Sequence, residues 1–296
     1  MRVTPGMTAD NALYNLQKGR TVLGRLQEQI ASGAVINRPS DDPITTRQLL
    51  NVESKLEEGE QYLSNISKGD LWLNMSETAL EGMVDVLAQS RKVAGTVGSG
   101  SADSTVRQNA VSQLTELKKQ LIDMGNTQLG DQYLFAGFKT DTAPFSKSDN
   151  TYHGSSDDIS VEIDQGSLAA INITGDSLLK GTGSYGSVDI LQTFDNLITA
   201  INNNDSSSIQ TEAAKLDDAM KQVSNAISDV GGRLNRLENA QTMVTRDQST
   251  LTGIISDTQG VDMIQAAVDL NQQQTAFEAA LSATAKISQL SLLDYL

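Results

Sequence analysis

Apolar residues near the start of the chain recur at steps of three and four, which places them on one face of a helix. The series is thin, because Ala12 and Gly19 occupy two of its positions. The remaining positions carry larger apolar side chains, namely Leu16, Leu23, Leu26 and Ile30. A helix with so thin an apolar face needs a partner helix to cover it.

A turn and a second helix follow. Ser32-Gly33 can end the first helix, and Asp42-Pro43 offers an N-cap carboxylate followed by proline at the first helical position. The apolar steps of three and four resume at Leu49 and continue to Leu87. A glycine-rich stretch at 95–101 ends this helix. A third helix is predicted from about residue 103 to residue 125.

The helical period disappears between residues 131 and 187. Five of the 12 aromatic residues lie between Tyr133 and Tyr152, and Ile159, Val161 and Ile163 alternate with polar residues. Alternation with a period of two indicates strands with one buried face. Similar alternation around Asn172 predicts a further strand. The segment is therefore predicted to form a small β-rich domain with its own aromatic cluster.

Helical patterns return at about residue 187. One helix runs to about 202, a long one follows the polar turn at 202–208, and a last one begins near residue 261. The predicted fold is mainly α: a long helical coiled coil or bundle formed by the N- and C-terminal segments, with a small β-rich domain inserted in the middle. Three regions follow from these patterns: 1–42 with 257–296 (terminal helices), 43–130 with 188–256 (helical rod) and 131–187 (inserted outer domain).

The two ends of the chain carry opposite charge. Residues 1–40 hold five basic and two acidic groups, a net charge of +3. Residues 256–296 hold five acidic groups and one basic group, a net charge of −4. Opposite charge on two amphipathic segments is expected for helices that pair with each other or with copies of each other.

Composition narrows the possible functions. The net charge of −15 disfavours binding to nucleic acids and to anionic membranes. With no cysteine and one histidine, thiolate metal sites, cysteine nucleophiles and histidine-rich metal sites are excluded. No apolar run reaches the length of a membrane-spanning helix, and no ordinary secretory signal is visible. We expect no metal and no cofactor.

His153 is the candidate general base. Ser155 and Asp157 lie nearby in the sequence, but the members of a catalytic triad meet in space and are rarely neighbours in the chain. No nucleophile-elbow motif accompanies them. A calcium loop formed by nearby aspartates is also disfavoured, because their spacing does not fit one. A solvated loop histidine is the favoured interpretation, and we expect no enzyme activity.

Several motifs, in order, resemble those of bacterial flagellins and their relatives. These are residues 32–43, with the sequence SGAVINRPSDDP, and residues 231–238, with the sequence GGRLNRLE. Two further motifs resemble the hook-associated protein 3 family, the hook–filament junction proteins, more than flagellin. They are residues 133–140, YLFAGFKT, and the end of the chain, LSLLDYL.

The resemblance implies a structural protein of the bacterial flagellum that is exported by the flagellar type III apparatus without a cleaved signal peptide. It also implies contacts with copies of itself, hook-associated protein 1, flagellin and a cytoplasmic export chaperone. The terminal helices would form the assembly interface, through Leu16, Leu23, Leu26, Ile30, Leu270, Phe277, Leu281, Ile287 and Leu290. The alternatives are a short flagellin that builds the filament itself and, from another class, a secreted hydrolase that uses the insert.

Overall fold

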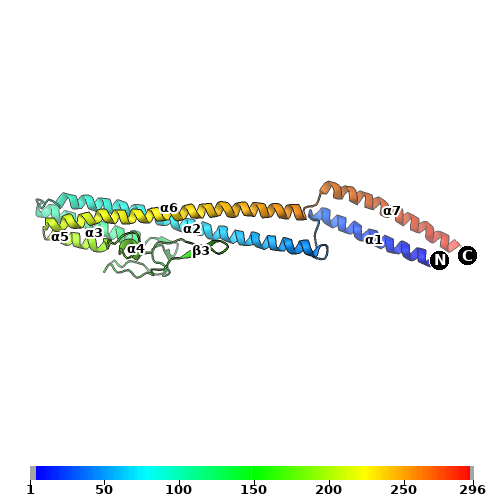
Figure 1. The fold of residues 1–296 in the computed structure, drawn as a ribbon, viewed down its shortest axis with the longest axis horizontal. Coiled ribbons are helices and arrows are strands. Elements are labelled where there is room, and N and C mark those ends of the chain that lie inside the picture. Colours follow the sequence, from blue (N-terminus) through cyan, green and yellow to red (C-terminus); the bar gives the residue numbers. More distant parts are fainter. Residues whose placement is uncertain (1–4, 148, 294–296) are drawn as a thin grey trace. The chain divides into compact units, whose positions relative to one another are not determined.

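The computed structural model describes residues 5–147 and 149–293 and is mainly helical (Figure 1). The predicted fold class is confirmed: long helices lie at both ends of the sequence, with a small strand-containing region in the middle. The helices are α1 (Pro5–Ser32), α2 (Pro43–Val97), α3 (Ser104–Gly125), α4 (Gly175–Leu179), α5 (Ile190–Asn202), α6 (Ser206–Gln259) and α7 (Met263–Leu293). The strands are β1 (Gln128–Leu129), β2 (Gln132–Tyr133), β3 (Ser160–Asp164) and β4 (Ser167–Ala170).

The chain forms two compact units. The terminal unit contains residues 1–58 and 247–296, and the central unit contains residues 59–246. The boundaries fall inside α2 and α6, later in the chain than the edge expected at 42 and earlier than the edge expected at 257. The division into three regions stays a prediction.

Local capping explains where several helices begin and end. Gly33 adopts a positive φ of 72° directly after the end of α1, a conformation that glycine adopts without strain. The Asp42 carboxylate accepts hydrogen bonds from the backbone N–H groups of Ile44 (3.0 Å) and Thr45 (3.1 Å) at the start of α2. Asp103 caps α3 in the same way. The turns predicted at these places are confirmed.

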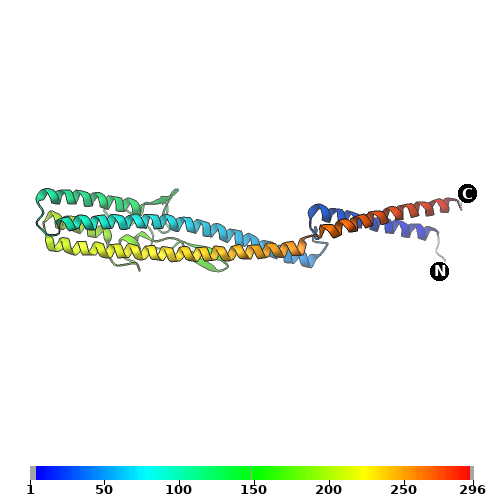
Figure 2. The same cartoon turned by 90° about the horizontal axis from the view of Figure 1, so that it is seen from above.

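The central unit has a continuous apolar core between α2, α3, α5 and α6. Leu73, Leu80 and Leu87 of α2 are fully buried, as are Val223 and Val230 of α6. The two helices approach closely at Gly69, where an added Cβ would lie 3.1 Å from a methyl carbon of Leu237. Figure 2 shows the α2 and α6 ribbons side by side over this unit.

The strand-containing insert shares this core. Phe135, Phe145 and Ile173 are buried in the same cluster as Leu80 of α2 and Phe194 of α5. Gly125 at the end of α3 leaves room for the Phe145 ring, because an added Cβ would lie 2.9 Å from it. The expectation that the aromatic cluster belongs to the insert alone is therefore wrong. The apolar residues of the insert need the helices to cover them.

Two short antiparallel hairpins make up the β structure. β1 pairs with β2, and β3 pairs with β4 in a register that shifts between Glu162 and Asp164. The alternation at 159–163 thus correctly predicts a strand. The strand expected around Asn172 does not form: β4 ends at Ala170, the Ile171 N–H makes one more backbone bond, to the Ile159 carbonyl (2.9 Å), and side chains take over the hydrogen bonding at Asn172. The Asn172 side chain accepts from the Ile159 N–H (2.7 Å), and its carbonyl accepts from Arg233 (2.7 Å).

Candidate assembly interface

In the terminal unit, α1 and α7 lie side by side (Figures 1 and 2). Gly19 of α1 packs against Phe277 of α7, with 3.2 Å between an added Cβ and the ring. The apolar residues of α1 that share the Gly19 face are half-buried: Leu16, Leu23, Leu26 and Ile30. This contact within one chain provides the partner helix that the thin apolar face of α1 needs.

The interface residues predicted on α7 differ in exposure. Leu270 and Phe277 are half-buried on the side of α7 that faces α1. Leu281 is 45% exposed. Ile287 and Leu290 belong to α7, but their side chains lie outside the described residues. The assignment of these positions to an assembly interface stays a prediction.

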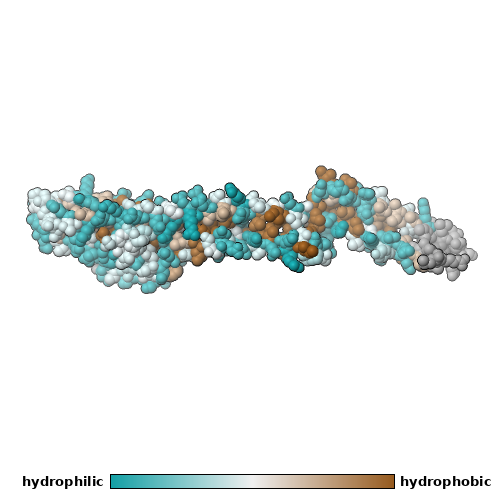
Figure 3. Space-filling model, viewed as in Figure 1, coloured by the Kyte–Doolittle hydropathy of each residue, from teal (hydrophilic) through white to brown (hydrophobic). Residues whose placement is uncertain are grey.

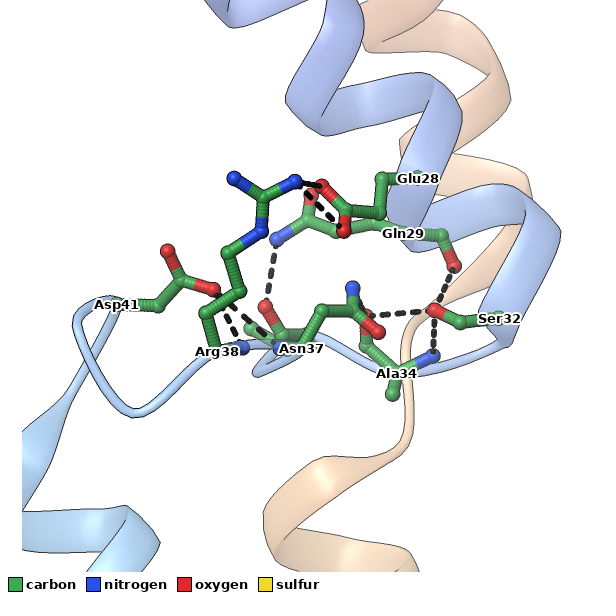
Figure 4. A network of polar contacts seen from close by, with 8 residues as sticks. Glu28, Gln29, Ser32, Ala34, Asn37, Arg38 and Asp41 are labelled. Atoms are coloured by element: carbon green, nitrogen blue, oxygen red, sulfur yellow. Dashed lines mark hydrogen bonds and ion pairs between the residues drawn. The ribbon is translucent and has the colours of Figure 1, made fainter.

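A polar network holds the turn between α1 and α2 (Figure 4). Asn37 and Arg38 donate their backbone N–H groups to one carboxylate oxygen of Asp41, at 3.3 and 3.0 Å. The Arg38 guanidinium donates to both carboxylate oxygens of Glu28 at 3.1 Å. Gln29 donates its side-chain N–H to the Val35 carbonyl at 2.8 Å. The turn is thus tied back to the last turns of α1.

The same turn pairs with the short connection between α6 and α7. The Val35 N–H donates to the Gln259 carbonyl at 2.7 Å, and the Val261 N–H donates to the Gly33 carbonyl at 3.0 Å. Asp262 then caps α7 as Asp42 caps α2. Hydrogen bonds from Thr45 and Ile44 hold the pKa of the Asp42 carboxyl below its ordinary value. The two interruptions of the long helices are therefore joined to each other.

The terminal unit leaves much of its apolar surface uncovered. Among the described residues, its buried apolar side chains are Leu49 and Ala266, whereas the central unit contains a large buried cluster. Figure 3 shows apolar surface gathered where α7 begins. The exposed large apolar residues of this unit are Met7, Leu13, Tyr14, Val35, Ile44, Leu50, Ile254, Met263, Ile264, Val268 and Leu281. Leu13 and Tyr14 lie off the face that packs on α7 and are not part of the apolar period seen in the sequence.

The candidate catalytic residues do not assemble. His153 is exposed, and its Nε2 atom lies 3.0 Å from the Thr151 hydroxyl. The Ser155 hydroxyl donates to the Asp157 carboxylate and not to the histidine. Hydrogen bonds from Thr151 lower the pKa of Asp149 to about 2, which is typical of a turn aspartate held in its charged form. These contacts are those of a solvated loop.

The described residues contain no group of three or more histidine and acidic side chains arranged to hold a metal ion. None of their helices is long and apolar enough to cross a membrane.

Comparison with known proteins identifies both helical ends. The N-terminal helical region of bacterial flagellin matches residues 4–140, and its C-terminal helical region matches residues 213–296. Flagellar hook-associated protein 3 of Escherichia coli is 24% identical, with 99% of each chain covered. Flagellin of Bacillus subtilis is 23% identical, over 98% of this chain and 97% of that one.

A solved structure from Vibrio parahaemolyticus, described as a flagellar hook-associated protein, is 26% identical with a TM-score of 0.67. The match covers 74% of this chain and all of that one. The names of these relatives are those of flagellar components. Because it carries both helical regions of bacterial flagellin in their order, this chain belongs to the flagellin family, and it is similar to hook-associated protein 3 over nearly its full length.

Proposed function

We propose that the protein is a structural component of the bacterial flagellum that joins hook-associated protein 1 to the flagellin filament at the hook–filament junction. The observation that carries this proposal is the uncovered apolar surface of the terminal unit. Side chains such as Ile264 (81% exposed) and Tyr14 (66% exposed) are solvated in one copy. Contiguous exposed apolar surface marks a site of protein contact.

The apolar surface is also consistent with a subunit that is monomeric before export and assembles afterwards. A contact that joins different surfaces of successive copies, and does not close into a ring, generates a helical tube. A terminal unit with few buried apolar residues gains most of its burial from neighbouring copies. In this proposal Leu281 contributes to that contact, together with the other interface residues predicted on α1 and α7.

The motif at residues 133–140 favours a hook-associated protein over a flagellin. The Phe135 carbonyl accepts hydrogen bonds from the Gly175 N–H (2.8 Å) and the Tyr152 hydroxyl (3.0 Å). Gly137 has a positive φ of 61°, and an added Cβ would collide with the Ser155 carbonyl. The motif is a close-packed part of the insert. A short flagellin that builds the filament itself remains the second candidate, since a flagellin matches 98% of the chain.

The proposal includes a location and partners. The protein acts outside the cell as part of the flagellum, after export through the flagellar type III apparatus without a cleaved signal peptide. Its partners are copies of itself, hook-associated protein 1 below, flagellin above and a cytoplasmic chaperone before export. The proposed role is structural and involves no enzyme activity, cofactor, metal, nucleic acid or membrane.

Deletion of the gene in its own host tests the proposal. A junction protein is needed to retain flagellin, so the deletion strain should secrete unpolymerised flagellin into the medium and lack filaments. If the protein is itself the filament flagellin, the strain will have no flagellin to secrete. A separate strain, in which His153 and Asp157 are replaced with alanine, tests the hydrolase alternative. Normal filaments in that strain are expected, whereas loss of a measurable hydrolase activity would favour the insert enzyme.

A further inference from the structure

A turn of the insert, at residues 136–139, presents an aromatic ring to solvent. Phe138 in this turn is 62% exposed, whereas Phe135 and Ala136 just before it are fully buried. Among the described aromatic residues of the central unit, it is the one with an exposed side chain. Aromatic rings bury a large apolar area and are enriched where proteins meet. We call residues 136–139 the Phe138 turn.

Backbone hydrogen bonds hold the Phe138 turn in one conformation. The Lys139 N–H donates to the Ala136 carbonyl at 3.3 Å and closes the turn, in which Gly137 has a positive φ of 61°. The Ala136 carbonyl also accepts from the Ser155 N–H at 2.8 Å, which ties the turn to the rest of the insert. The Phe138 ring is therefore already positioned before a partner binds, which lowers the entropic cost of binding.

A groove of about 340 Å³ lies between α2 and α6 of the same unit, and we call it the α2–α6 groove. Its floor is apolar, with Ile66 (2% exposed) and Leu237 (1% exposed). Its two rims carry exposed carboxylates, Asp70 on α2 and Glu238 on α6. An apolar floor between acidic rims is complementary to an apolar side chain that has a basic neighbour.

Gly231 leaves space beside this groove. It lies three residues before Leu234 and seven before Glu238, which places it on the groove face of α6. Glycine inside a helix is unfavourable compared with alanine, yet an added Cβ at Gly231 would meet no atom within 4 Å. Packing within one copy therefore does not require a glycine here, and the space is free for a side chain of another molecule.

The groove and the insert lie on opposite sides of the α2–α6 pair. On the insert side, Asn65 of α2 donates to the Glu162 carbonyl and Arg236 of α6 donates to the Leu168 carbonyl, each at 2.9 Å. Glu238 lies two residues after Arg236, which turns it by about 200° to the other side of α6. In Figure 2 the α2 and α6 ribbons pass in front of the insert. The rigid turn of one copy therefore cannot reach the groove of the same copy.

We infer that the Phe138 turn of one copy docks in the α2–α6 groove of a second copy, with the ring on the apolar floor and Lys139 between the acidic rims. Lys139 is exposed, and its ammonium group donates to a neutral group, the His153 carbonyl, at 3.3 Å. This inference rests on the proposed function, in which copies of the chain assemble. The contact joins different surfaces, so each bound copy still offers a free groove to the next one.

Cross-linking identifies the partner, because the chain contains no cysteine of its own. The test variant carries Thr142→Cys, beside the turn, and Asn235→Cys, in the groove lining; both sites are exposed. It replaces the wild-type gene in the deletion strain, and isolated flagella are treated with a short bismaleimide. We expect covalent trimers and larger products on a denaturing gel, because each copy is joined to two others.

Two controls define this ladder of products. Each single-cysteine variant should give no product larger than a dimer. Thr142→Cys with Gln210→Cys places the second thiol at an exposed site about 38 Å away on the same helix and should give no ladder.

Removal of the ring tests whether the contact matters for assembly. Phe138→Ala should reduce the number of filaments per cell, counted by electron microscopy, about fivefold or more, because truncation of an anchor commonly weakens a contact by that factor. Leu168→Ala removes another exposed apolar side chain of the insert (60% exposed) and should leave filaments unchanged. Purified Phe138→Ala should melt at the wild-type temperature, because the ring is solvated in one copy.

The inference is overturned if the double-cysteine variant forms no ladder, since both substitutions spare Phe138, Lys139 and the two carboxylates. Cross-linking to a different flagellar protein in place of the ladder overturns it as well, and so do normal filaments with Phe138→Ala. The wild-type gene separates this inference from the proposed function. If that gene restores no filaments to the deletion strain, the proposed function fails, whereas restored filaments without a ladder refute this contact alone.

Discussion

Gly19 of α1 lies so close to Phe277 of α7 that a methyl group on the glycine would sit 3.2 Å from the ring. The absence of a side chain at position 19 lets the two helices of the terminal unit approach each other. Glycine inside a helix is otherwise unfavourable compared with alanine. Gly24, in the same helix, is exposed and has no atom within 4 Å of an added Cβ.

The same substitution at these two glycines should have opposite effects. Gly19→Leu would force the helices apart and should lower the stability of the α1–α7 pair by about 1–3 kcal/mol. Gly24→Leu should raise it by about 0.5–1 kcal/mol, because leucine is a better helix former and nothing is displaced. Hydrogen exchange of the α1 amides in the isolated protein measures both. Equal changes in the two variants would contradict the close packing at Gly19.

Phe145 should stabilise the helices as well as the insert. Its ring is 1% exposed and lies 5.4 Å from the Tyr152 ring, centroid to centroid. Phe145→Ala should destabilise the central unit by about 3–5 kcal/mol, because it leaves a cavity in the shared core. The matched control is Phe138→Ala, in the same insert but 62% exposed, which should change stability by less than about 0.5 kcal/mol. Thermal unfolding followed by circular dichroism checks both, and an unchanged helical transition in Phe145→Ala would indicate a separate core.

The sequence predicted those features that depend on nearby residues. A helix end is decided within a few residues, as at Gly33, Asp42 and Asp103, and these ends were predicted well. The shared core is not visible in the sequence because its contacts join separate segments, such as Phe145 with Gly125 of α3 and Gly175 of α4. A periodic pattern reports which face is buried, but not which element covers it.

The same limit applies to the candidate interface: one face of α1 could be predicted from the sequence, and the other could not. The face of α1 around Leu23 was visible as a period of three and four, and the structure uses it for α7. The outward face of α1 at Gln17, Thr21 and Gly24 gives no apolar period in the sequence, because these side chains are polar or absent. Its position became apparent only from exposure and from the open space at Gly24.

Gln222 should be among the most sensitive polar residues of α6. It is 1% exposed and makes three hydrogen bonds to backbone, donating to the Leu178 and Val188 carbonyls and accepting from the Val188 N–H. Gln222→Leu would leave these backbone groups without partners and should cost about 2–4 kcal/mol. Gln241→Leu, at an exposed position of the same helix, should change stability by less than about 0.5 kcal/mol. Urea unfolding compares them, and similar midpoints for the two variants would refute this role.

Alkaline pH should destabilise the central unit. Burial raises the pKa of Tyr152 and of Tyr185 above the ordinary value of 10, and the carboxylates of Asp176 and Asp229 add to the effect. Above pH 10 the unfolded chain loses these phenolic protons while the folded chain keeps them. Their contribution to stability is therefore complete below pH 10 and declines as the pH rises further.

Unfolding in urea at a series of pH values from 8 to 11 measures this decline. The double variant Tyr152→Phe, Tyr185→Phe should lose less stability between pH 10 and pH 11 than the wild type does, although it starts lower because the hydrogen bonds of both hydroxyls are gone. Tyr14→Phe, at an exposed phenol, serves as the control and should follow the wild type. An equal decline in the double variant would mean that other groups cause the alkaline loss.

Leu281→Asp should prevent assembly without unfolding the subunit. Leu281 is 45% exposed in one copy, so an aspartate there remains hydrated and should change the free energy of unfolding by less than about 1 kcal/mol. In the proposed assembly the same carboxylate would lose its water without gaining a partner, a penalty of several kcal/mol per ion that recurs in every subunit. The variant should therefore be exported and melt near the wild-type temperature, while the cells release flagellin instead of growing filaments. Leu281→Met keeps the apolar side chain and should support normal filaments, and normal filaments with Leu281→Asp would remove this residue from the interface.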